Sequence, residues 1–168
     1  MDSSIPRGEL GEIVRAARER TGVPAVAAGL RCGEEVELAA DGPVDVATPF
    51  RVASLTKWIT ASLAVQCLDL DAPTTAGPSA RALLSHTAGW RPESPEPLPE
   101  AARGLWSYSN AGYRAAGVAC AEACGVSFAR ALHERVLDPL AMEATGFERA
   151  DAAASGHAQE GEKGQRLI

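Results

Sequence analysis

The sequence is short of basic residues and of cysteine, and each shortage argues against a class of protein. Its 168 residues carry 16 Lys and Arg against 22 Asp and Glu, which gives a net charge of −6. Because no positive field gathers phosphates, nucleic acid is disfavoured as a main partner. No CxxC or HExxH spacing occurs, so we expect neither a metal site nor a cofactor. Four cysteines are too few for a disulfide framework and lie in apolar or helical surroundings, which predicts reduced, buried thiols at Cys32, Cys67, Cys120 and Cys124.

Long hydrophobic runs are also missing. The longest apolar run, residues 58–68, is too short to cross a bilayer and is interrupted by Thr60, Ser62 and Gln66. The first six residues lack both the basic start and the apolar stretch of a secretory signal. The sequence therefore predicts a cytoplasmic protein without a membrane span.

The apolar content is sufficient for one domain. It amounts to 46% of the residues, and at this length a compact domain buries roughly 70% of the surface that its unfolded chain exposes. The expected fold class is α/β (α+β), an antiparallel sheet flanked by helices. Periodicity and turn residues predict a helix over 8–21, a hairpin of strands at 25–30 and 36–40, and helices over 54–68, 79–85, 111–124 and from Ser127 to about Leu137.

Three segments complete the organisation. The helix over 54–68 is expected to be central and buried, because Trp58, Ala61, Val65 and Leu68 repeat at helical spacing. A second segment, residues 91–100, contains four prolines and should form an exposed loop. The third, residues 148–168, has almost nothing apolar larger than alanine, so we expect a mobile polar tail that leaves 1–147 as the folded domain.

Ser54 and Lys57 form the first chemical pattern. Three residues of helix place the two side chains on one face, one turn apart, so a hydroxyl and an amine can meet. Serine is a poor nucleophile until a base takes its proton, and a neutral lysine can be that base. A lysine in a first helical turn opposes the helix dipole, which favours a functional interpretation. The alternative is a solvated lysine beside a serine cap, and the spacing alone does not decide between them.

Tyr108 and Asn110 form the second pattern. Alternate residues of an extended segment point the same way, so a phenol and an amide can share a pocket. The phenol could relay the serine proton, and the amide could hold both the lysine and a substrate carbonyl. As alternatives, Asn110 could cap the helix over 111–124, and Tyr108 could pack with Trp106 against the core.

Several motifs in order resemble the serine β-lactamases and penicillin-recognising enzymes, specifically the branch of class C β-lactamases, DD-peptidases and esterases. The resemblance spans about residues 23–147, and its ordered motifs are more specific together than singly. They are the nucleophile motif FRVASLTK (50–57), LDLDAP (68–73), LLSHTAG (83–89), the tyrosine motif YSN (108–110), and VLDPLAM followed by TGF (136–142 and 145–147).

This resemblance implies a role for each candidate residue. Ser54 would be the acyl-accepting nucleophile, and its backbone N–H would supply half of an oxyanion hole. Lys57 would activate the serine, Tyr108 would relay a proton, and Asn110 would position the substrate. His86 is expected to be structural, in a turn after a short helix. The implied substrates are small molecules, namely β-lactams, D-alanyl peptides, or small esters and amides, with the predicted cytoplasmic location favouring the last two.

One family motif is not found. The third motif of the family, KTG or HxG, comes later in full-length members, and the pair Lys163-Gly164 lacks its threonine. We therefore expect a truncated member whose sheet is incomplete without C-terminal strands. Two interpretations stay open. The chain is either a serine hydrolase or a non-catalytic remnant that acts as a binding module or needs a partner chain. An open sheet edge would permit self-association.

Overall fold

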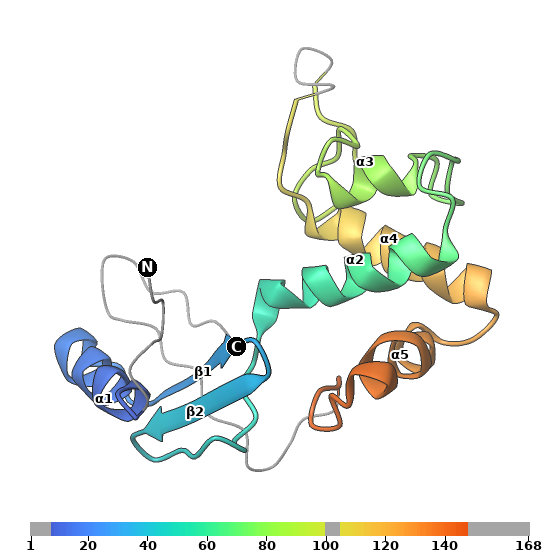
Figure 1. Ribbon diagram of the computed structural model, residues 1–168. Helices are drawn as coiled ribbons and strands as arrows, with labels where there is room; N and C mark the ends of the chain where they lie inside the picture. Colours follow the sequence, from blue (N-terminus) through green and yellow to red (C-terminus); the bar gives the residue numbers. More distant parts are fainter. Residues whose placement is uncertain (1–7, 100–104, 148–168) are drawn as a thin grey trace. The chain divides into compact units, whose positions relative to one another are not determined.

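The computed structural model describes residues 8–99 and 105–147, and these fall into two units that divide at Val52 (Figure 1). The first unit holds a helix and a hairpin, and the second holds the remaining helices. The expected fold class is confirmed, because an antiparallel sheet and helices make up the chain. The expectation of one domain over 1–147 stays a prediction, and the tail expected at 148–168 lies outside the described residues.

Helix α1 (Leu10–Thr21) begins the first unit and confirms the helix predicted there. It ends at Gly22, whose φ of 68° closes the helix through a hydrogen bond from its N–H to the Arg18 carbonyl. Val14 is buried. Arg18 also forms an ion pair with Asp41 of the hairpin, which ties the helix to the sheet.

The predicted hairpin is confirmed as β1 (Val26–Cys32) and β2 (Glu35–Asp41), a two-stranded antiparallel sheet. Gly42 follows β2 and has to be glycine, because its φ is +97° and a Cβ there would lie 2.3 Å from the Pro24 carbonyl oxygen. Within the described part of the chain each strand pairs on one side and keeps one open edge. Self-association through such an edge stays a prediction.

Among its described residues, the second unit contains four α-helices and three short helical turns, one of which precedes α2. Helices α2 and α4 lie side by side (Figure 1), and α5 packs against both. Their shared core is formed by Leu63, Ala64, Cys120, Ala131, Leu132, Val136 and Leu137. The bounds confirm the order expected from the sequence: α2 (Thr56–Cys67), α3 (Ala80–Leu84), α4 (Asn110–Cys124), α5 (Phe128–Leu132) and further helical turns over 133–137 and 138–140.

The predicted buried face of α2 is wrong at Trp58 and Val65, whereas Leu68 packs half-buried against the core. Trp58 is 76% exposed and Val65 is 59% exposed, whereas the buried side chains include Leu63 and Ala64. Tertiary packing explains this exposure. Helices α4 and α5 cover the side of α2 that carries Leu63, and the side that carries the larger Trp58 is left uncovered by them. Spacing identified the helix, but it did not identify which side its neighbours cover.

The cysteines differ in their surroundings. Cys120 is buried in the core, and burial raises the pKa of its thiol to about 12. Burial also raises the pKa of the half-buried Cys67. All four cysteines are free thiols. Cys32, however, is exposed at the end of β1, so the expectation that it is buried is wrong.

Residues 91–99 form the loop expected from their prolines, and most of them are exposed. The loop folds back on itself, because Trp90 and Pro97 form an isolated antiparallel bridge. Hydrogen bonds join the Arg91 N–H to the Glu96 carbonyl and the Leu98 N–H to the Gly89 carbonyl. Among the helices that the structure describes, no single one is long and apolar enough to cross a bilayer.

Replacing Ser127 by alanine should lower the free energy of unfolding by about 1 kcal/mol, because the variant loses a helix cap. In the protein, Ser127 Oγ accepts a hydrogen bond from the Arg130 N–H at the start of α5. Urea unfolding followed by circular dichroism measures the loss. Ser62→Ala on the exposed side of α2 is the control and should change stability by less than about 0.5 kcal/mol. Equal losses in the two variants would contradict the cap.

Candidate active site

Ser54 and Lys57 meet at the start of α2. Ser54 lies in a 3₁₀ turn, Ala53–Leu55, directly before the helix, and Lys57 is the second helical residue. The Lys57 Nζ lies 3.5 Å from the Ser54 Oγ, which is a long hydrogen bond. Ala53 holds a φ of 43°, a left-handed conformation that few residues other than glycine adopt. The turn therefore presents an exposed hydroxyl beside a half-buried amine.

Tyr108 brings a phenol to the same serine from a segment more than fifty residues away. Its hydroxyl donates a hydrogen bond of 2.8 Å to the Ser54 Oγ. The Lys57 Nζ lies 4.8 Å from the centre of the tyrosine ring. The hydrogen bond from Lys57 and then that with Ser54 lower the pKa of Tyr108 below its ordinary value. The phenol is thus the group in closest hydrogen-bonding contact with the serine, and the lysine favours its ionised form.

Asn110 completes the cluster. Its Oδ1 accepts a hydrogen bond of 2.7 Å from the Lys57 Nζ. The suggestion that Asn110 caps α4 is wrong, because the cap is Ser109, whose Oγ accepts the Gly112 N–H at 3.0 Å. With the preceding serine in the capping role, the amide of Asn110 faces the lysine. The start of α4 also lies close to α3, since a Cβ at Gly112 would lie 3.2 Å from the Leu83 carbonyl oxygen.

His86 holds the segment that carries Tyr108. Its Nδ1 accepts the Ser109 N–H at 3.0 Å, and its carbonyl oxygen accepts the Ser107 N–H at 2.8 Å. The imidazole lies 4.5 Å from the Tyr108 ring, centre to centre. Burial and then the charge of Lys57 lower the pKa of His86, which favours the neutral ring that accepts at Nδ1. These contacts support the structural role expected from the sequence.

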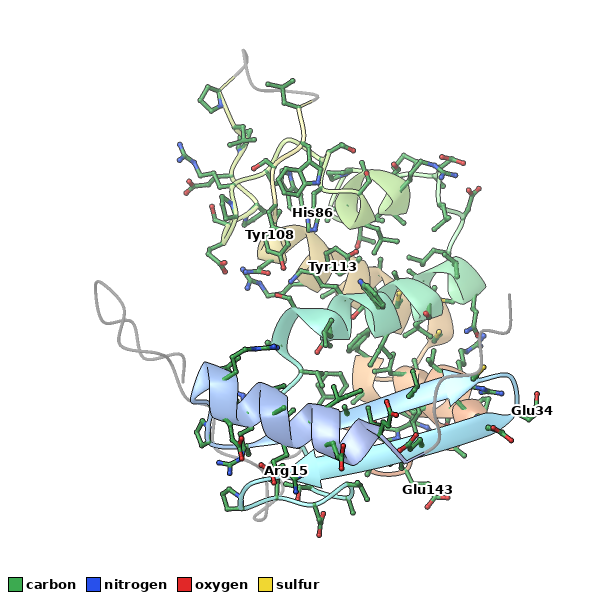
Figure 2. The ribbon with its side chains drawn as sticks, turned by 60° about the vertical axis from the view of Figure 1, so that its left-hand side comes forward. Arg15, Glu34, His86, Tyr108, Tyr113 and Glu143 are labelled. Carbon is green, nitrogen blue, oxygen red and sulfur yellow. The ribbon has the colours of Figure 1, made fainter. Side chains whose placement is uncertain are left out.

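The cluster lines an open cavity of about 470 Å³. Figure 2 shows His86, Tyr108 and Tyr113 grouped around the start of α4. The polar lining is Ser54, Lys57, His86, Tyr108 and Tyr113, and the apolar lining is Val52, Leu55 and Trp58. The exposed Trp58, which the sequence pattern placed in the core, is thus part of the cavity wall.

Sequence reasoning missed two residues of this site. Tyr113 lies 5.4 Å from the Lys57 Nζ, measured to its ring centre, and its hydroxyl donates to the Leu84 carbonyl at 3.0 Å. A signal for it exists, because it follows Asn110 by three residues on one helix and so shares its face. Glu93 accepts a hydrogen bond of 2.5 Å from the Asn110 Nδ2, and no local pattern places this loop residue there.

The arrangement brings together the parts of a nucleophilic site. An exposed hydroxyl contacts a phenol that can take or return its proton, and a cationic side chain lies beside both. Within residues 8–99 and 105–147 no group of three His, Cys, Asp or Glu side chains could hold a metal ion. The contacts around Ser54 are compatible with acyl or group transfer to its hydroxyl.

Comparisons with known proteins give a consistent result. A family model described as Beta-lactamase matches residues 10–166. Among solved structures, SurE has 27% sequence identity and a TM-score of 0.70, over 78% of this chain and 38% of its own. A beta-lactamase from Mycobacterium bovis has 33% identity and a TM-score of 0.62, over 76% and 48% of the two chains.

A third similar structure is the D-amino acid amidase from Ochrobactrum anthropi SV3 in complex with D-phenylalanine. It has 26% identity and a TM-score of 0.64, over 79% of this chain and 50% of its own. Among curated proteins no sequence match was found. The chain thus spans half or less of the length of each of these three structures.

Proposed function

The chain belongs to the beta-lactamase family, and from that premise we propose that it is a serine hydrolase that forms an acyl-enzyme on Ser54. Lys57 is the activating partner, Tyr108 the proton relay, and Asn110 the amide that positions lysine and substrate. The observation that carries the proposal is the 2.8 Å contact between the Tyr108 hydroxyl and the Ser54 Oγ, beside the Lys57 ammonium. Two residues from distant segments, Lys57 and Tyr108, thus converge on one hydroxyl.

The first step would form a bond between Ser54 Oγ and the carbonyl carbon of the substrate. The serine proton passes to the Tyr108 oxygen in its ionised form, which the neighbouring positive charge of Lys57 stabilises, and the carbonyl oxygen takes up negative charge. The backbone N–H of Ser54 is one donor for that oxygen. When the carbon–nitrogen or carbon–oxygen bond breaks, Tyr108 returns the proton to the leaving group. Water then hydrolyses the ester on Ser54 and restores the serine.

The proposed substrates are β-lactams, D-alanyl peptides, and small esters or amides. Support for amide-type substrates comes from the neighbours, since two of the three similar structures are described as a beta-lactamase and a D-amino acid amidase. The cavity beside Ser54 has apolar walls at Val52, Leu55 and Trp58, which suit an apolar group next to the reacting carbonyl.

Intact-protein mass spectrometry tests the proposal. The wild-type chain is exposed separately to a penicillin and to an activated ester, and hydrolysis of a D-amino acid amide is followed in parallel. We expect a stoichiometric adduct of one acyl group per chain, and peptide mapping should locate it on the peptide that contains Ser54. Urea-unfolded protein is the control and should gain no such adduct. The absence of an adduct from protein shown to be folded would favour the non-catalytic alternative.

A further inference from the structure

We propose that Glu93 is a positioning residue that fixes the side-chain amide of Asn110 so that its oxygen, and not its nitrogen, faces Lys57. This inference rests on the proposed function for its effect on rate, but its geometry does not depend on that function. Glu93 lies in the proline-rich loop, outside the four residues assigned to the reaction. It reaches the site through the Asn110 Nδ2, which donates to its Oε1 at 2.5 Å.

The chemistry of the partners determines which way the amide points. A carboxylate only accepts hydrogen bonds, and an ammonium group only donates them. Asn110 lies between one of each, with its Nδ2 on Glu93 and its Oδ1 2.7 Å from the Lys57 Nζ. A flipped amide would direct two donors at each other and two acceptors at each other. The two neighbours therefore permit one orientation.

The loop that carries Glu93 is anchored on the first turn of α4. The Pro92 carbonyl accepts the N–H groups of Asn110 and Ala111, at 2.7 and 3.1 Å. The Ser109 hydroxyl donates to the Arg91 carbonyl at 3.0 Å. Three consecutive loop residues thus contact the start of α4, Arg91 and Pro92 through their carbonyl groups and Glu93 through its carboxylate. The position of the carboxylate is set by this anchoring, although its side chain is 68% exposed.

Arg114 holds the same carboxylate from the other side. It lies one turn after Asn110 on α4, so both side chains project from one face of the helix. Its Nη2 donates to the Glu93 carbonyl at 2.6 Å, and its Nη1 lies 3.4 Å from the Glu93 Oε2. The hydrogen bond from Asn110, then those from Arg114 and the charge of Lys57, lower the pKa of Glu93. The side chain is thus held as a carboxylate, the form that can only accept.

The composition of the chain provides a direct probe. Asn110 is the single asparagine in the sequence, so protein labelled with ¹⁵N-asparagine has one side-chain NH₂ pair. A hydrogen bond to a carboxylate moves the bonded proton of that pair downfield. We expect this downfield signal in the wild type at neutral pH and its loss in Glu93→Gln. The matched control is Glu96→Gln, in the same loop, where the exposed Glu96 is paired with Arg91 and should leave the signal in place.

Acylation by the activated ester is the second readout. A glutamine at position 93 can turn either end toward Asn110, so the amide is no longer held by a group that only accepts, and its hydrogen bond with Lys57 is fixed less firmly. We expect acylation of Ser54 to slow about tenfold in Glu93→Gln, with little change in the concentration of ester at half saturation. Glu96→Gln should react at the wild-type rate.

Two results would overturn the inference. One is an NH₂ signal in Glu93→Gln that matches the wild type, and the other is an unchanged rate of acylation in that variant when the wild type reacts. If the wild type forms no acyl-enzyme, the proposed function fails. The labelled NH₂ pair then still decides whether Glu93 holds Asn110.

Discussion

Replacing Ser54 by alanine is expected to abolish the covalent adduct with both the penicillin and the activated ester. The variant removes the Oγ that would carry the acyl group, and the neighbouring Tyr108 hydroxyl is the group proposed to move the proton. The loss should be complete in intact-mass spectra taken after a reaction time that saturates the wild type. Circular dichroism checks whether the variant is folded.

Ser62→Ala is the matched control for this prediction. Ser62 lies on the same helix, is exposed, and donates its hydroxyl to the Trp58 carbonyl at 3.0 Å. Its variant should acquire the adduct at the wild-type rate. An adduct of full yield on Ser54→Ala would show that the reagent labels another nucleophile and would contradict the assignment of Ser54.

Replacing Lys57 by methionine should slow acylation by about 10²–10⁴-fold, the range that a positioned proton-transfer group contributes. Lys57 contacts three partners of the reaction, since it lies 3.5 Å from the Ser54 Oγ, binds the Asn110 Oδ1, and lowers the pKa of Tyr108. Methionine keeps the length of the stem and removes the charge. Single-turnover mass spectrometry with the activated ester gives the rate.

The same variant makes a prediction about pH. Lys57 is the largest cause of the lowered pKa of Tyr108, so its removal should raise that pKa toward the ordinary value of a tyrosine. Tyr108 and Tyr113 are the two tyrosines of the sequence, and Tyr113→Phe assigns their signals in a ¹³C-tyrosine titration. Lys163→Met, which replaces the other lysine, should alter neither the rate nor the titration. A Tyr108 pKa that does not rise in Lys57→Met would contradict the contact.

Much of the site follows from local rules. Ser54 and Lys57 are three residues apart at the start of one helix, and Tyr108 and Asn110 are two residues apart at the start of another. Within each pair, short-range backbone geometry makes the two side chains point the same way. The convergence of the two pairs followed from the resemblance to a known family. The structure adds the contacts between them, which no spacing within either segment specifies.

What the sequence did not provide depends on tertiary packing. The buried side of α2 was misassigned because Trp58 is large and apolar, whereas its neighbours α4 and α5 cover the side with Leu63. The alternative that Asn110 caps α4 is wrong, and the sequence could not exclude it because Ser109 and Asn110 are both good capping residues. Glu93 lies on a loop with no periodicity, and the contacts of that loop with α4 place it at the site.

The left-handed conformation of Ala53 positions the nucleophile but lowers the stability of the fold. Such a conformation at a residue other than glycine costs about 1–3 kcal/mol, and the net stability of a domain is about 5–15 kcal/mol. Glycine at this position would relieve the cost, and it would also loosen the turn that aims the Ser54 hydroxyl at Tyr108. Selection for heat tolerance would therefore favour Ala53→Gly, next to the nucleophile. Selection for a high rate of turnover would reject the same substitution.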